Sequence, residues 1–234
     1  MQKPTFLTHE IYHIYNRGVE KRNIFTSGRD YKRFCLYLEK LNSANPAGKL
    51  YRETGEVRPP HPGHSGEVRP PHPHARELPL VEILAFVLMP NHYHLLARQV
   101  QENGIVKFMQ KLGTGYTMYF NTKNERVGPL FQGSFKAVHI ETNEQLMYIP
   151  HYIHMNPLDL NRGGSTSPRE FMENYAWSSL GDYIAEERKF PFLKKEFILE
   201  MFEGADNYKR DLRELLQDRE RSALNMFSDI HLDS

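Results

Sequence analysis

The sequence of 234 residues has a single cysteine, Cys35, and no long apolar run. A lone cysteine excludes an internal disulfide framework and is typical of a reducing cytosol. A membrane-spanning helix needs about 20 consecutive apolar residues, and no run here approaches that length. The N-terminus, Met1-Gln2-Lys3-Pro4, is not followed by the apolar segment of a signal peptide. We therefore expect a soluble protein of the cytoplasm.

The net charge of +1 hides an uneven distribution of charge. Residues 1–49 carry nine Lys and Arg against four Asp and Glu, and residues 104–140 carry five against one. Residues 195–234 carry six against ten. Because clustered positive charge binds phosphate backbones, this pattern favours a nucleic-acid-binding body with an acidic C-terminal segment. A solvated surface with uneven charge is the alternative that composition leaves open.

The hydrophobic periodicity predicts an α+β protein. Strands are expected where β-branched, aromatic or contiguous apolar residues gather, at 9–17, 80–88, 92–99 and 134–141. Helices are expected at 28–42 and 104–121, and after a capping box formed by Thr142 and Gln145. This order is that of a ferredoxin-like βαββαβ core with one helix added. In the usual strand order of that fold, the strand at 9–17 and the strand at 92–99 are neighbours in the middle of the sheet.

Two segments lie outside this core. Residues 44–79 hold most of the prolines and a tandem repeat, GEVRPPHP at 55–62 and at 66–73, which predicts a disordered insertion. After Pro157 the chain carries apolar residues at helical spacing, at 179–186, 195–203 and 206–221. We therefore predict a core at 1–160 and a helical C-terminal extension at 161–234.

Two short motifs carry the chemistry. His92 and His94 lie two residues apart on a predicted strand, so both imidazoles project from one face and can bind one divalent cation. Tyr152 and Asn156 lie four apart on the predicted added helix and share a face. An amide oxygen is a suitable ligand for magnesium or manganese. A histidine pair at a metal, facing a tyrosine hydroxyl, is suited to breaking a phosphodiester through a covalent intermediate.

Each motif has an alternative. A second pair, His72 and His74, lies in the proline-rich repeat, where no rigid strand can direct two rings at one ion. Pro150 precedes Tyr152 by two residues and removes a helical hydrogen bond, which favours a kink. Tyr148, one turn earlier, is therefore the competing nucleophile.

Four motifs in register resemble those of a known family. Met89–Leu96 (MPNHYHLL) and Tyr152–Pro157 (YIHMNP), with Tyr12–Gly18 and Tyr175–Ser179, resemble the single-tyrosine transposases of the histidine–hydrophobic–histidine endonuclease superfamily. With its C-terminal extension the chain looks most like the REP-associated tyrosine transposases. The resemblance covers about 9–185 apart from the repeat.

The resemblance implies a fold and a mechanism. It implies a ferredoxin-like core that binds single-stranded DNA folded into hairpins, with Mg²⁺ or Mn²⁺ as the cofactor. His92, His94 and Asn156 match the metal ligands of that family, and Tyr152 matches its nucleophile. The product of cleavage is a 5′-phosphotyrosine with a free 3′-hydroxyl. We expect a monomer or a homodimer, at the nucleoid and with no membrane partner.

Backbone phosphates are expected to contact basic residues around these elements, namely Arg17, Lys21, Arg22, Arg98, Lys107, Lys111 and Lys136. The alternative function is a domesticated, non-cleaving binder of structured single-stranded DNA or RNA. A third possibility is a hydrolytic metalloenzyme that works without a covalent step.

Overall fold

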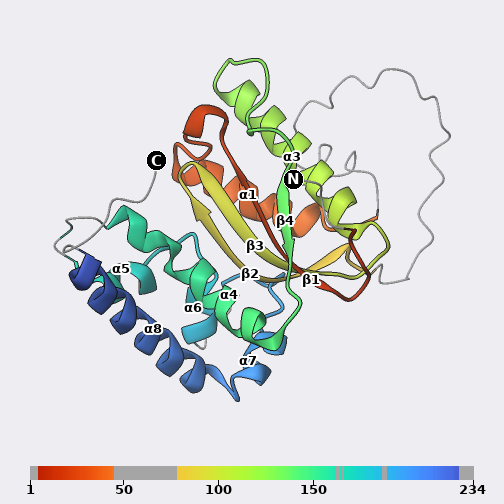
Figure 1. The fold of residues 1–234 in the computed structure, drawn as a ribbon. Helices are drawn as coiled ribbons and strands as arrows, with labels where there is room; N and C mark the ends of the chain where they lie inside the picture. The colour runs from red at the N-terminus through yellow and green to blue at the C-terminus, as the bar shows by residue number, and fades with distance from the viewer. Residues whose placement is uncertain (1–4, 45–77, 162–163, 165, 186–188, 227–234) are drawn as a thin grey trace.

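The structure is a computed structural model that describes residues 5–44, 78–161, 164, 166–185 and 189–226 (Figure 1). The predicted insertion at 44–79, with His72 and His74, lies almost entirely outside the described residues. Of the helices in the part that is described, none is both long and apolar enough to cross a membrane.

The centre of the structure is one antiparallel sheet of four strands, in the order β2-β3-β1-β4. The strands are β1 Ile11–Arg17, β2 Val81–Met89, β3 His92–Gln99 and β4 Lys136–His139. This is the strand order of a ferredoxin-like sheet, so the predicted fold class is confirmed. The two middle strands are β1 and β3, as the sequence predicts.

Helices cover both faces of this sheet (Figure 1). Helices α1 and α3 pack on one face, whereas α4 crosses the other face and contacts β2 and β3. The helices are α1 Gly28–Lys40, α3 Gly104–Lys123, α4 Asn143–Met155, α5 Pro168–Glu173, α6 Leu180–Ile184, α7 Glu196–Met201 and α8 Ala205–Met226, with 3-10 turns η1 Val19–Lys21 and η2 Asn156–Leu160. The short helix α5 has no counterpart among the predicted elements, because its six residues are too few for a visible period.

Helix α4 begins at the capping box that the sequence predicts. The Gln145 N–H donates to the Thr142 hydroxyl, and the Gln145 side-chain oxygen accepts from the Thr142 N–H. Pro150 has no N–H to donate to the Leu146 carbonyl, yet the helix is continuous from Asn143 to Met155. The helix therefore carries both candidate tyrosines on one uninterrupted segment.

The C-terminal segment lies along the free edge of β2. The Leu88 N–H donates to the Trp177 carbonyl at 2.9 Å, and the Ser179 N–H donates to the Phe86 carbonyl at 2.9 Å. Such contacts protect a strand whose unpaired backbone groups would otherwise be exposed.

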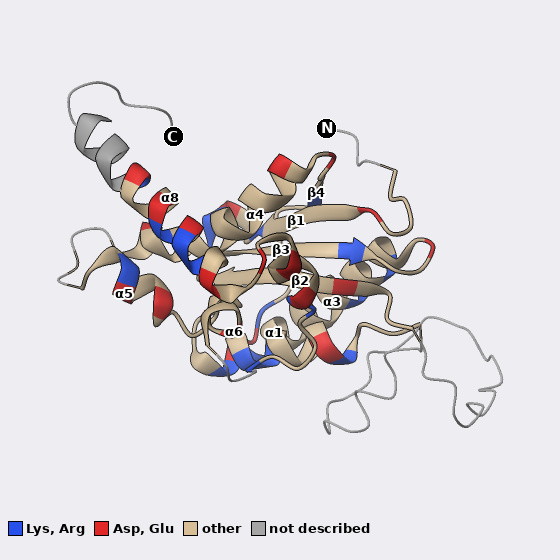
Figure 2. Cartoon of the chain, turned by 90° about the horizontal axis from the view of Figure 1, so that it is seen from below, with Lys and Arg blue, Asp and Glu red and all other residues tan. Residues whose placement is uncertain are grey.

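Charged residues gather on the helices, including both signs along α8, while the central strands are largely uncharged (Figure 2).

His151 of α4 is buried against the C-terminal segment. Only 2% of it is exposed, its ring lies 4.3 Å from that of Tyr208 and 5.0 Å from that of Phe202, and neither ring nitrogen has a hydrogen-bond partner among the described residues. Burial lowers the pKa of His151 from 6.5 to about 4. The folded protein therefore holds this ring neutral while the unfolded chain protonates it in acid.

Replacing His151 by phenylalanine is expected to stabilise the fold, since two buried polar atoms without partners are removed. We expect a gain of about 1 kcal/mol in the free energy of unfolding at pH 7.5. Between pH 6.5 and 4 the unfolded wild type binds a proton that the folded state does not, so wild-type stability falls as the pH falls. At pH 5 the advantage of His151→Phe should therefore grow by about 2 kcal/mol. Urea unfolding at both pH values measures this, and an equal advantage at both would contradict it.

Candidate active site

The pairing of the strands places one row of chemically active side chains across the sheet. In the antiparallel register of β1 and β3, Tyr15 lies opposite His94 and Arg17 opposite His92. On the other side of β1, Lys136 of β4 lies opposite Tyr15. Because alternate residues of a strand share a face, all five side chains project toward α4. His92 and His94 are thus brought together with two basic residues and a phenol.

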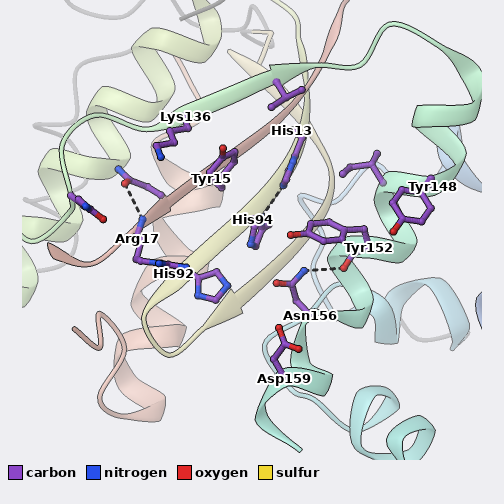
Figure 3. A pocket seen from close by; sticks show the side chains of 14 residues that line it. His13, Tyr15, Arg17, His92, His94, Lys136, Tyr148, Tyr152, Asn156 and Asp159 are labelled. Atoms are coloured by element: carbon purple, nitrogen blue, oxygen red, sulfur yellow. Dashed lines mark hydrogen bonds between the residues drawn. The ribbon is translucent and has the colours of Figure 1, made fainter. Parts of the chain in front are cut away.

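Helix α4 completes the site from above the sheet (Figure 3). The Tyr152 ring lies edge-on to the His94 and His13 rings, with centroids 5.7 Å and 5.8 Å away. The Tyr148 ring lies one turn farther from the histidines and contacts that of Tyr152, with centroids 6.5 Å apart. Both phenols are partly exposed. Of the two tyrosines, Tyr152 is therefore the one that faces the histidines.

These side chains line a cavity of about 720 Å³. It contains the four residues that the sequence predicts as nucleophile and metal ligands, namely Tyr152, His92, His94 and Asn156. It also contains Arg17 and Lys136.

The surroundings of His92 leave one ring nitrogen free to bind a cation. Its Nδ1 lies 2.6 Å from Oδ1 of Asn91, whose Nδ2 donates to the Lys21 carbonyl at 3.2 Å. Because an amide oxygen only accepts, Nδ1 of neutral His92 carries the proton and Nε2 carries a lone pair. Burial lowers the pKa of His92, and the nearby Asn156 amide, which favours the protonated ring, opposes this more weakly.

The side-chain amide oxygen of Asn156 is a second acceptor, and it lies on the side of His92 that faces the cavity. Its Nδ2 donates to the Tyr152 carbonyl at 2.9 Å, and its amide oxygen points toward His92 (Figure 3). A lone pair on Nε2 of His92 and an amide oxygen thus face each other. Two acceptors in this arrangement attract either a proton or a cation between them.

His94 is held by a third histidine, His13 of β1. Nδ1 of His94 lies 2.8 Å from Nε2 of His13, which leaves Nε2 of His94 available to the cavity. Burial lowers the pKa of His13 to about 4 and that of His94 to about 2, where neighbouring positive charges also contribute. Both rings are therefore neutral at pH 7 and offer lone pairs.

The donor set fits a small divalent cation. The His92 and His94 rings lie 5.1 Å apart with their planes at 89°, and the amide of Asn156 lies beside them. In the described part of the chain, no group of three or more His, Cys, Asp or Glu side chains is arranged to hold a metal ion. Two imidazoles with one amide oxygen form an incomplete ligand set, which suits a metal that keeps open positions for water or substrate.

Five of the seven basic residues predicted to contact DNA lie away from the cavity, namely Lys21, Arg22, Arg98, Lys107 and Lys111. Arg98 pairs with Glu82, with Nε 2.7 Å from the carboxylate, and lies over the Phe197 ring. Lys107 and Lys111 donate to backbone carbonyls at 3.2 Å and 2.6 Å. Their contact with DNA stays a prediction.

Sequence reasoning missed four residues of the site or its support: His13, Tyr15, Asn91 and Asp159. His13 and Tyr15 alternate with Arg17 on β1, a period of two that could have placed them on one face. Asp159 lines the cavity and pairs with Arg219 of α8 at 2.9 Å. No local pattern in the sequence indicates that last contact, since it joins segments sixty residues apart.

Comparison with known proteins agrees with the predicted resemblance. Residues 77–156, which include both histidines and Tyr152, match the family described as "Transposase IS200 like". The resemblance to the single-tyrosine transposases is confirmed, and the match supports a DNA-processing role of transposase type. Among solved structures, the chain is similar to one described as "Structure of the REP associates tyrosine transposase bound to a REP hairpin". The two sequences are 13% identical, the TM-score is 0.45, and the match covers 80% of this chain and 86% of that chain. The comparison with curated proteins found no match.

Proposed function

Starting from the match of residues 77–156 to the IS200-like transposases, we propose that this protein is a metal-dependent endonuclease and strand transferase acting on hairpin-forming single-stranded DNA. The observation that carries the proposal is the approach of Tyr152 to His94 across the cavity, with ring centroids 5.7 Å apart. A nucleophile candidate and a cation-binding histidine pair share one cavity within a single chain. We therefore propose that this site needs no residue from a second copy of the chain.

Tyr152 is the proposed nucleophile. Its hydroxyl oxygen forms a bond to the scissile phosphorus, and the bond from that phosphorus to the 3′ oxygen breaks. Tyr152 loses its proton, and the departing 3′ oxygen gains one. The products are a 5′-phosphotyrosine and a free 3′-hydroxyl. Rejoining reverses these bond changes with another 3′-hydroxyl, so strand transfer needs no ATP.

His92, His94 and Asn156 are the proposed ligands of Mg²⁺ or Mn²⁺. Such an ion, when bound, would polarise the scissile phosphate and stabilise negative charge on its oxygens. His13 and Asn91 orient the two imidazoles through their Nδ1 atoms, so that each Nε2 faces the cavity.

Arg17 and Lys136 are the proposed phosphate contacts within the cavity. Arg17 follows Tyr15 by two residues on β1, Lys136 lies opposite Tyr15 on β4, and Nζ of Lys136 is 6.0 Å from the centre of the Tyr15 ring. Two cationic side chains beside an aromatic ring suit a DNA strand, because they can neutralise its phosphates while a base stacks on the ring.

We also propose that the protein lies with its DNA at the nucleoid.

Removing the Tyr152 hydroxyl is expected to abolish covalent attachment to DNA. With a 3′-labelled hairpin oligonucleotide and Mn²⁺, the wild type should give a labelled protein–DNA adduct on a denaturing gel. Tyr152→Phe should lower its rate by a factor on the order of 10⁴ or more, because the attacking atom is gone. Tyr148→Phe is the matched control, since it loses the same hydroxyl one turn away on the same helix, and it should retain the adduct.

Other outcomes of this assay point to other functions. An adduct lost in Tyr148→Phe but kept in Tyr152→Phe would move the nucleophile by one turn. Tight, salt-dependent binding with no adduct in the wild type would favour the non-cleaving binder. Cleavage that survives in Tyr152→Phe and stops on chelation would favour hydrolysis without a covalent step.

Metal binding is expected to depend on the orienting residues as well as on the ligands. Titration of Mn²⁺, followed by its electron paramagnetic resonance signal, should give one site in the wild type and none in His92→Ala. His13→Leu keeps both ligands but leaves Nδ1 of His94 without its partner. We expect its affinity to fall by about 10- to 100-fold, as is usual when such a partner is lost.

His139 supplies the control for this titration. It also lies on the sheet and pairs with Glu10 at 2.9 Å, but it does not line the cavity. His139→Gln should bind Mn²⁺ like the wild type. Equal affinity in His13→Leu and the wild type would contradict the orienting role of His13.

A further inference from the structure

We propose that the C-terminal segment is part of the catalytic apparatus, because His154 fastens the nucleophile helix α4 to it through a continuous chain of hydrogen bonds. His154 is a positioning residue in this proposal, and it does not touch the substrate. The inference rests on the proposed function of Tyr152. It assigns a role to the histidine of the YIHMNP motif that faces away from the cavity.

The chain of hydrogen bonds is fully buried. Nδ1 of His154 lies 2.6 Å from the Tyr208 hydroxyl of α8, and Nε2 lies 2.7 Å from the Ser179 hydroxyl. The Ser179 hydroxyl lies 3.1 Å from the Phe86 carbonyl of β2 and accepts from the Phe86 N–H at 2.8 Å. His154, Tyr208 and Ser179 are each 0% exposed. Every polar atom of these three side chains has a partner.

The donor and acceptor roles of these groups form one consistent arrangement. The Ser179 hydroxyl donates to the Phe86 carbonyl, and its oxygen accepts from Nε2–H of His154. With its proton on Nε2, the neutral ring of His154 carries a lone pair on Nδ1, which accepts from the Tyr208 hydroxyl. One tautomer of His154 satisfies all donors and acceptors.

The geometry links the position of Tyr152 to that of the histidine strand. Residues two apart on a helix project to nearly opposite sides, so Tyr152 enters the cavity while His154 enters the C-terminal segment. Phe86, which receives the Ser179 contacts, pairs in register with Leu95, the residue after His94. These hydrogen bonds therefore connect α4 to the strand pair that carries His92 and His94.

A second feature of α4 is consistent with this positioning role. Pro150 removes one hydrogen bond from the turn just before Tyr152, which leaves the helix weaker at that turn. The hydrogen bonds of His154 lie one turn after Pro150, and they hold the helix from outside where the backbone hydrogen bond of Pro150 is missing. A displacement of about 1 Å at a reacting group can cost about 100-fold in rate, so small shifts of this helix matter.

The decisive comparison is between Tyr208→Phe and Tyr183→Phe. Both tyrosines are buried in the same cluster, with ring centroids 4.8 Å apart, and each variant loses one hydroxyl hydrogen bond. The Tyr208 bond goes to His154, whereas the Tyr183 hydroxyl donates to the Leu84 carbonyl at 2.7 Å. With the hairpin substrate and Mn²⁺, single-turnover adduct formation should slow about tenfold or more in Tyr208→Phe only. Hairpin affinity should be unchanged in both.

Two results would overturn the proposal. Adduct formation at the wild-type rate in Tyr208→Phe would show that the contact does not position the helix. Equal slowing in Tyr183→Phe would show a general effect of core stability, which urea unfolding of both variants measures independently.

A conservative variant and a spectrum complete the test. The side-chain amide introduced by His154→Gln can accept from Tyr208 and donate to Ser179, so this variant should recover rate relative to His154→Ala; no recovery counts against the proposal. Nitrogen NMR of histidine-labelled wild type at pH 7 should show His154 with its proton on Nε2. The spectrum does not depend on activity. If the wild type forms no adduct, the proposed function fails, whereas a proton on Nδ1 of His154 contradicts the proposed hydrogen bonds of His154 alone.

Discussion

The whole site depends on the antiparallel register of β1 and β3. In that register Tyr15 lies opposite His94 and Arg17 opposite His92, and the face they share is the one that α4 crosses. A slip of one residue would turn the His13, Tyr15 and Arg17 side chains of β1 to the opposite face. The register is secured on that opposite face, where Tyr12 and Ile14 are completely buried. Core packing on one side of the sheet thus determines chemistry on the other.

The cavity contains neutral histidines and permanently charged basic residues, and burial is the reason that the histidines are neutral. It lowers the pKa of His13, His92 and His94, so these rings are neutral near pH 7 and present lone pairs. The positive charge in the cavity comes instead from Arg17 and Lys136, which line it. A cation can therefore bind to the histidines without first displacing their protons, while phosphate oxygens find permanent charges beside them.

Much of this arrangement could be predicted from the sequence, because it follows from local periodicity. The strand at 92–99, the capping box at Thr142 and the shared face of Tyr152 and Asn156 are all read from spacings of two, three or four residues. What could not be predicted joins distant segments. The contact of His13 with His94 spans 81 residues and depends on the strand register, which no local pattern contains. The contact of Asp159 with Arg219 depends on how α8 packs.

The same distinction explains why one motif of six residues serves two parts of the molecule. Within Tyr152–Pro157, the helical period turns Tyr152 and Asn156 toward the sheet and His154 toward Ser179 and Tyr208. A side chain that fixed the helix from the cavity side would compete with substrate for the same space. Anchoring from the opposite side leaves the cavity open and still determines where the Tyr152 hydroxyl lies. The C-terminal extension, which the sequence presents as an appendage, therefore contributes to the geometry of the site without entering it.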